Sequence, residues 1–92
     1  MQGYKVFIGF DFTGIELTES GLLAGCNLQG ANLTGADLRE ADLRGTDLSG
    51  ADLTGADLRG ADLTGSTLLG VHHSDETRWP AGFEVPSTHL VQ

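Results

Sequence analysis

Leucine recurs at every fifth position through the middle of the chain, from Leu28 to Leu68. A small residue precedes each leucine by two positions and a polar residue lies between the two, so the repeating unit is A-(D/N)-L-x-x. This period of five matches neither an amphipathic helix, which repeats about every 3.6 residues, nor a strand, which alternates at every second residue. The chain must therefore turn a corner once in each repeat.

Glycine ends eight of the nine repeats between Cys26 and Gly70, and it favours tight turns because it accepts a positive φ. We expect the small residue and the leucine to point inward, the polar residue between them to point outward, and the last two residues to form the corner. Glu40 replaces the glycine in the remaining repeat, so we expect its corner to use a different turn type.

A quarter turn in each repeat predicts that four repeats close one coil. Successive coils then stack at the strand spacing of about 4.8 Å, with backbone hydrogen bonds between them. Ladders of leucine fill the interior, and small residues are required beside them because four inward leucines leave little room in each coil. The pattern therefore predicts an all-β fold, a four-sided β-solenoid.

The repeat frame continues in degenerate form through residues 5–25, with a slip of one residue at Ser20. Thirteen repeats in all make a little over three coils. The residues predicted to form the core are Phe7, Phe12, Leu17, Leu23, Leu28, Leu33, Leu38, Leu43, Leu48, Leu53, Leu58, Leu63 and Leu68. Residues 4–12 are dense in β-branched and aromatic side chains, so an ordinary edge strand or hairpin is the alternative there.

The tandem repeats of residues 26–70 resemble those of the pentapeptide-repeat proteins, a family defined by A-(D/N)-L-x-x units. The resemblance implies a right-handed quadrilateral β-helix. The handedness is implied by the family and does not follow from the spacing.

After Gly70 the repeat stops, and residues 71–92 contain both prolines and the single tryptophan. A solenoid ends in an open apolar cross-section that terminal residues must cover. We therefore divide the chain into a solenoid at 1–70 and a non-repetitive C-terminal cap and tail at 71–92, and expect the residues beyond Ser87 to be loose. The predicted cap residues are Trp79, Pro80 and Phe83, in the string TRWPAGF, which is similar to the tail that folds over the last coil in short bacterial pentapeptide-repeat proteins.

The 92 residues form one domain, with 13 acidic and 5 basic residues and a net charge of −8. Such a charge argues against nucleic acid and anionic membranes as direct partners, and it favours cationic partners or simply solubility. The sequence shows neither a signal peptide nor an apolar segment long enough to span a membrane, so we expect a cytoplasmic protein.

The outward acids of the repeats invite a catalytic or calcium-binding interpretation. They are Asp37, Asp42, Asp47, Asp52, Asp57 and Asp62. Neighbouring repeats point in directions at right angles, and acids on the same face lie side by side on a flat wall, so we expect them to solvate the surface and to bond backbone amides at the corners. Cys26 occupies an inward small-residue position and replaces alanine, while the adjacent His72 and His73 point opposite ways. We therefore expect no catalytic residue, no cofactor and no metal site.

Arginine accompanies the acids on two of the four faces, as Arg39 and Arg59 on one and Arg44 on the next. The other two faces carry Asp47 and Asp52 among uncharged polar residues. The solenoid thus has a mixed-charge side and a polar, weakly acidic side, and a binding surface could use either.

These observations favour a non-enzymatic rigid β-solenoid that serves as a structural or protein-binding module, with an unknown protein partner. The possible partner surface consists of Asp47, Asp52, Asp57 and Asp62. We expect a monomer or an end-to-end dimer through the N-terminal coil. The resemblance implies an alternative function, since some pentapeptide-repeat proteins mimic duplex DNA, bind DNA gyrase and confer quinolone resistance.

Overall fold

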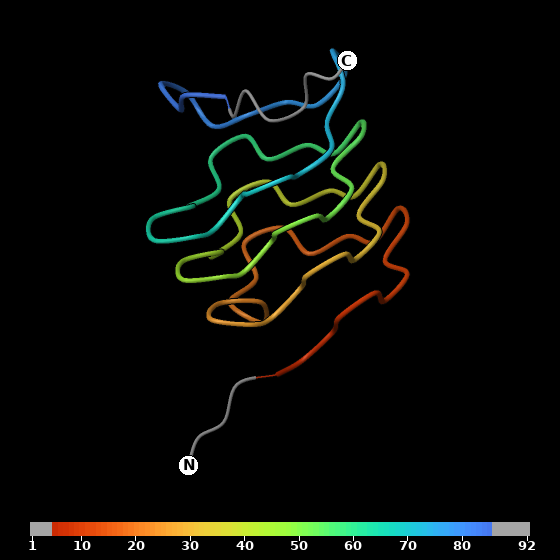
Figure 1. Cartoon of the computed structure of the whole chain (residues 1–92). Coiled ribbons are helices and arrows are strands. Elements are labelled where there is room, and N and C mark those ends of the chain that lie inside the picture. Colours follow the sequence, from red (N-terminus) through yellow and green to blue (C-terminus); the bar gives the residue numbers. More distant parts are fainter. Residues whose placement is uncertain (1–4, 86–92) are drawn as a thin grey trace.

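The computed structural model describes residues 5–85 and shows a stack of loops that advances from the N-terminal end to the C-terminal end (Figure 1). Within these residues the backbone forms neither a helix nor a strand of more than one paired residue. Pairing takes place through isolated parallel bridges, and a two-residue turn follows nearly every bridge. The fold is therefore built from single extended residues that alternate with corners.

The bridges connect residues 20 or 21 positions apart and arrange them in columns. We name these the Asn27 column (Val6, Asn27, Asp47, Thr67), the Asn32 column (Asp11, Asn32, Asp52, His72), the Asp37 column (Glu16, Asp37, Asp57, Arg78) and the Asp42 column (Asp42, Asp62). We call residues 5–25, 26–45, 46–65 and 66–85 the first, second, third and last coils. Each column thus takes one residue from each coil that it crosses.

The backbone hydrogen bonds of a bridge residue have a fixed direction. The amide of Asp47 donates to the carbonyl of Cys26 at 2.9 Å, and the carbonyl of Asp47 accepts from the amide of Leu28 at 2.7 Å. Both groups of the bridge residue therefore point to the preceding coil. The flanking inward residues bond the following coil, as the Leu48 amide does to the carbonyl of Thr67 at 2.8 Å.

Two places in the stack carry one extra residue. Val6 pairs with Asn27 at a separation of 21, and the extra residue lies in the turn at 22–25 that follows Ser20. Asp57 pairs with Arg78 at the same separation of 21, an insertion that the repeat pattern did not indicate. The chain absorbs each insertion in one corner, so the columns stay in register on both sides of it.

The interior consists of stacked leucine and small residues. The leucines from Leu23 to Leu63 are buried, while Phe7, Phe12, Leu17 and Leu68 are partly buried and pack against them. The partly buried members lie in the first and last coils, where a neighbouring coil covers one side only. Cys26 and Thr46 are buried at inward small-residue positions, with exposed fractions of 2% and 0%.

The corner at Glu40 differs from our expectation. Its φ is 61°, close to the 67° of Gly35 and Gly45, so it uses the same left-handed corner and not a different turn type. Glu19, at the equivalent corner one coil earlier, has a φ of 56°. The backbone geometry of the stack thus imposes the conformation even where the residue is not glycine.

The pairing also extends beyond Gly70, where we expected the solenoid to end. His72 pairs with Asp52 and Arg78 with Asp57, and Val71 and Thr77 are buried beneath them. These residues keep the inward, outward, inward alternation without the A-(D/N)-L letters, which is why a boundary at 70 is too early. The bridges end at Arg78, and the cap residues Trp79, Pro80 and Phe83 follow it within the last coil.

The first coil follows the solenoid pattern rather than the alternative hairpin. Val6 and Asp11 form parallel bridges with Asn27 and Asn32, whereas a hairpin within residues 4–12 would pair its own two strands antiparallel. The expectation of a loose tail beyond Ser87 falls outside the described residues.

Candidate interaction surface

The outward Asp and Asn side chains fasten the corners that follow them. In each case Oδ1 accepts the backbone amide two residues later, at 3.0–3.3 Å. The residues that do so are Asp11, Asn27, Asn32, Asp37, Asp42, Asp47, Asp52, Asp57 and Asp62. The expectation that these acids bond backbone amides at the corners is confirmed, and the bond explains why Asp and Asn alternate freely at this position.

The Asp37 column carries a ladder of paired charges. The guanidinium of Arg39 donates two hydrogen bonds to Asp37, both at 2.8 Å, and Arg59 does the same to Asp57 at 2.9 and 2.6 Å. Arg39 Nε also lies 4.0 Å from Asp57 Oδ2 in the next coil. Because the Arg39 and Arg59 side chains are 50% and 57% exposed, the ladder forms a charged wall that a partner can reach.

A hollow of about 390 Å³ lies at the corner beside this ladder, lined by Thr18, Glu19, Arg39, Glu40 and Arg59. Glu19 and Glu40 are the two residues of 5–85 other than glycine with a left-handed backbone. Strained backbone of this kind is found at functional sites more often than elsewhere. We call the residues that line the hollow, together with Asp37 and Asp57, the Arg39 wall.

The Asp42 column repeats the arrangement on a smaller scale. Arg44 donates to Asp42 at 2.9 and 2.8 Å, and its Nε lies 4.0 Å from Asp62 Oδ2. Asp62 instead accepts the hydroxyl of Thr64 at 2.6 Å.

The Asn27 and Asn32 columns are polar and weakly acidic. Gln29 Nε2 in the second coil donates to Asp47 Oδ2 in the third at 3.0 Å, and the Thr54 hydroxyl donates to Asp52 at 2.6 Å. Within the described residues of these two columns no arginine neutralises the acids. The unequal distribution of arginine expected from the sequence thus separates two kinds of wall.

These contacts lower the pKa of the surface carboxyls. The bidentate hydrogen bond from Arg44 lowers the pKa of Asp42 from 3.8 to about 2. Hydrogen bonds from Arg39 and Arg59 likewise lower the pKa values of Asp37 and Asp57. For Asp52, burial acts to raise the pKa, but hydrogen bonds from the Thr54 hydroxyl and amide outweigh it. All these acids are therefore held in the charged form, which suits a structural acceptor better than a general acid.

The structure does not bring the four acids of the predicted partner surface together. Asp47, Asp52, Asp57 and Asp62 each belong to a different column, so they encircle the third coil instead of sharing a wall. A surface on one side of the molecule takes members of one column from successive coils. The Arg39 wall satisfies this condition, and the strained corner at Glu40 is the feature that sequence reasoning misinterpreted.

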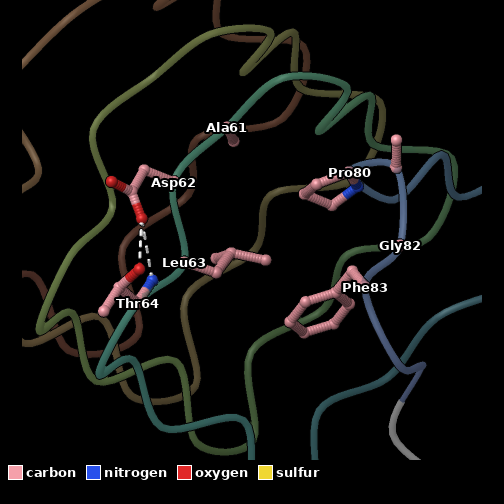
Figure 2. A pocket seen from close by; sticks show the side chains of 8 residues that line it. Ala61, Asp62, Leu63, Thr64, Pro80, Gly82 and Phe83 are labelled. Carbon is pink, nitrogen blue, oxygen red and sulfur yellow. Dashed lines mark hydrogen bonds between the residues drawn. The ribbon is translucent and has the colours of Figure 1, made fainter.

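The predicted cap residues Pro80 and Phe83 lie beside the third coil (Figure 2). The rings of Trp79 and Phe83 stack with centroids 5.3 Å apart, and both pack against the core. Pro80 and Phe83 face Leu63 across an open hollow of about 400 Å³. The apolar end of the solenoid is therefore only partly closed.

Other candidate chemistry lies apart from the charged walls. Cys26 is buried and its Sγ lies 3.4 Å from the carbonyl of Leu22, a contact typical of a small core residue. The ring of His73 meets Trp79 edge to face at 5.4 Å, while His72 is exposed. In residues 5–85 no three His, Cys, Asp or Glu side chains gather where a metal ion could bind. Nor does any helix in this part of the chain have the length and hydropathy needed to cross a membrane.

Comparisons with known proteins agree with the geometry. Residues 26–65 match the family model for pentapeptide repeats in eight copies. The fold is similar to a pentapeptide repeat protein from Nostoc Pcc 7120, with 36% identity and a TM-score of 0.52 over 92% of this chain and 74% of that one. It is also similar to Rfr23 from the cyanobacterium Cyanothece 51142, with 32% identity and a TM-score of 0.57 over 80% of this chain.

A pentapeptide repeat protein from the thylakoid lumen of Arabidopsis thaliana is 35% identical, with a TM-score of 0.51 over 83% of this chain and 59% of that one. The chain spans only 46% of the length of Rfr23. Curated protein sequences yield no match. The period of five, the columns of outward Asp and Asn, and these structural similarities together show that the chain belongs to the pentapeptide-repeat family of β-helix proteins.

Proposed function

We propose that the chain is a non-enzymatic, rigid protein-binding module and that the Arg39 wall is its binding surface. The observation that carries the proposal is the bidentate pairing of Arg39 with Asp37 and of Arg59 with Asp57 on a half-exposed wall. Pairing fixes both guanidinium groups before any partner arrives, so little side-chain entropy is lost on binding. Arginine is also enriched at protein interfaces and among their energetically dominant residues.

The proposal includes the finer geometry of the fold. We propose a right-handed quadrilateral β-helix that makes three full turns between Val6 and Thr67, with part of a further turn after it. In this geometry each column is one row of a flat face, and equivalent side chains repeat about every 4.8 Å. A flat face with a fixed charge pattern suits a protein partner of complementary pattern.

The nature of the partner follows from charge. A net charge of −8 repels nucleic acid and anionic membranes, so the proposed partner is a protein. The alternation of arginine and acid on the Arg39 wall requires acidic and basic side chains in turn on the partner. We place this encounter in the cytoplasm.

The test is a quantitative capture experiment from an extract of the source cell. Arg39→Ala with Arg59→Ala removes both guanidinium groups, and Gln29→Ala with Ser49→Ala is the matched control on the Asn27 column. We expect one protein to be retained by the parent chain and by the control pair, and to be lost with the arginine pair. Equal retention by both double variants, with both folded, would refute the Arg39 wall as the binding surface.

A second candidate function is the DNA mimicry that the family resemblance implies. The observation in its favour is the net charge of −8 together with acids stacked in columns. Arg39, Arg44 and Arg59 interrupt that negative surface on two columns, because each is paired with an aspartate there. We rank this function second.

A further inference from the structure

Exposed apolar side chains concentrate at the N-terminal end of the stack. Val6, Ile8, Phe10 and Leu22 are each at least 50% exposed, and all four belong to the first coil. The described residues contain only two other large exposed apolar side chains, Leu69 and Val85. An apolar patch confined to one end of a soluble repeat protein marks an interaction site.

An open hollow lies in the same end of the core, and Leu22 of the patch is part of its lining. The hollow has a volume of about 220 Å³ and its lining includes Phe7, Phe12, Ile15 and Leu17. Phe7 meets both Phe10 and Phe12 edge to face, at 5.3 and 5.4 Å between ring centroids. This end is the red loop of Figure 1, and within residues 5–85 no preceding coil pairs with it.

The backbone at this end has a specific bonding pattern. In the later coils the bridge residues of the Asn27, Asn32 and Asp37 columns direct both the amide and the carbonyl to the preceding coil, as Asp47 does to the second coil. Val6, Asp11 and Glu16 are the bridge residues of the first coil, and among residues 5–85 no preceding coil meets them. Their amides and carbonyls therefore face outward in pairs along the open edge.

An outward amide and carbonyl on the same residue are what a hydrogen-bonded antiparallel pair uses, because two such residues exchange both bonds. A second copy related by a two-fold axis perpendicular to the stack presents the same edge running in the opposite direction. We propose that this chain forms a dimer through its first coil, N-terminal end to N-terminal end. The apolar rings of the two copies then close each other's hollow.

The two ends differ, which favours a closed dimer over a filament. A head-to-tail stack would need a regular repeat edge on the last coil, but there Trp79 and Phe83 replace the repeat, stack on each other and pack against the core. An interface that uses the same surface on both copies stops at two. The proposal does not depend on the Arg39 wall being a binding surface.

The size and charge of the end predict a weak, salt-dependent association. The transverse dimensions of 23 and 22 Å limit the contact to on the order of 500 Å² per copy, the lower limit for a specific interface. Docking also brings Asp11, Glu16 and Glu19 of each copy near the same acids of the other copy, and the first coil has only Lys5 to offset their negative charge. The two copies therefore repel each other. Added salt screens this repulsion, so the dimer strengthens as ionic strength rises.

The decisive experiment is sedimentation of the full chain over a range of concentrations, with two matched variants. Ile8 and Leu69 are equivalent residues of the first and last coils, because each follows a member of the Asn27 column by two positions. Their exposed fractions are 53% and 71%. We expect the parent chain to form dimers. The dissociation constant should rise at least tenfold in Ile8→Asp and stay unchanged in Leu69→Asp. A parent chain that stays monomeric at about 500 µM, and so has a dissociation constant well above that concentration, would overturn the proposal.

Two further outcomes would overturn the proposed dimer. They are oligomers that grow beyond two copies with concentration, and an equal weakening of the association by Ile8→Asp and Leu69→Asp. Either outcome would place the contact at both ends of the stack. Hydrogen exchange of the unmodified chain tests the backbone pairing without any substitution. We expect the amides of Val6, Asp11 and Glu16 to exchange more slowly at high concentration, and an exchange rate independent of concentration would refute the pairing.

Discussion

The carboxylate of Glu40 lies directly against the backbone of Gly60 in the following coil, in the space that a Cβ atom on Gly60 would occupy. Both residues adopt a left-handed backbone, with φ of 61° and 76°. The side chain of one corner therefore fits over the next corner only because that corner has no side chain. The strained glutamate and the glycine above it form one structural unit.

This unit predicts opposite effects for two substitutions. Glu40→Gly removes the left-handed strain of about 1–2 kcal/mol but adds about 0.5–1 kcal/mol of unfolded-state entropy, so we expect a net stabilisation of about 0.5–1 kcal/mol. Gly60→Ala adds both a strained φ and a clash with the Glu40 carboxylate, so we expect it to destabilise. Urea denaturation of the full chain measures both. If Glu40→Gly lowered the free energy of unfolding, the glutamate would have a stabilising contact that outweighs its strain.

The inward leucines that follow the members of the Asn27 column differ in burial. Leu48 is fully buried with a coil on each side, so we expect Leu48→Ala to cost about 2–5 kcal/mol through lost contacts and a cavity. Leu68→Ala is the matched comparison in the last coil, where the side chain is only partly buried, and we expect a smaller cost. Equal costs, measured by urea denaturation, would mean that the cap buries Leu68 as fully as a coil would.

The inward and outward positions could be predicted from the sequence because they depend only on alternation. Leu28, Leu48 and Asp47 lie where the five-residue frame puts them, since a one-residue shift would turn every leucine outward. The same physics explains the misplaced boundary at 70. Val71 and Thr77 continue the alternation with residues that the repeat letters do not describe.

The surface was harder to predict for a different reason. Asp52 and Asp57 are neighbours in the repeat but belong to different columns, so nearness in sequence does not place two acids on one wall. The unusual corner of Glu40 was visible as a break in the glycine rule, yet the sequence does not tell whether the chain changes its turn or strains the residue. The hydrogen bonds between coils decide this, as the bond of 3.0 Å from the Glu40 amide to the Arg59 carbonyl shows.

The charge pair of Asp42 with Arg44 predicts a specific pH dependence. The pKa of Asp42 falls from 3.8 to about 2 in the folded chain, so its stabilising effect is fully present above pH 3.8 and is lost as the pH falls through about 2. Asp42→Asn keeps the acceptor for the Arg44 amide, as Asn27 does for Gln29, but removes the charge. We expect the parent chain to exceed this variant in stability by a constant amount near neutral pH.

That difference should shrink below pH 3.8 and vanish near pH 2. The measurement is the urea midpoint of both proteins at several pH values, because subtracting them cancels the contributions of the other acids. A difference that persisted unchanged at pH 2 would show that the charge pair is not its source.

The last prediction separates the two candidate functions through DNA gyrase. A DNA mimic must present a long, continuous negative surface, but three steps of about 4.8 Å reach only on the order of 15 Å, less than half a turn of duplex. Arg39, Arg44 and Arg59 also neutralise acids on two columns. We therefore expect no inhibition of gyrase supercoiling at micromolar concentrations of the chain. Inhibition that faded steeply with added salt, and that disappeared when Asp47, Asp52, Asp57 and Asp62 were replaced by asparagine, would establish mimicry instead. In that case the N-terminal dimer would supply the missing length, and Ile8→Asp would abolish the inhibition as well.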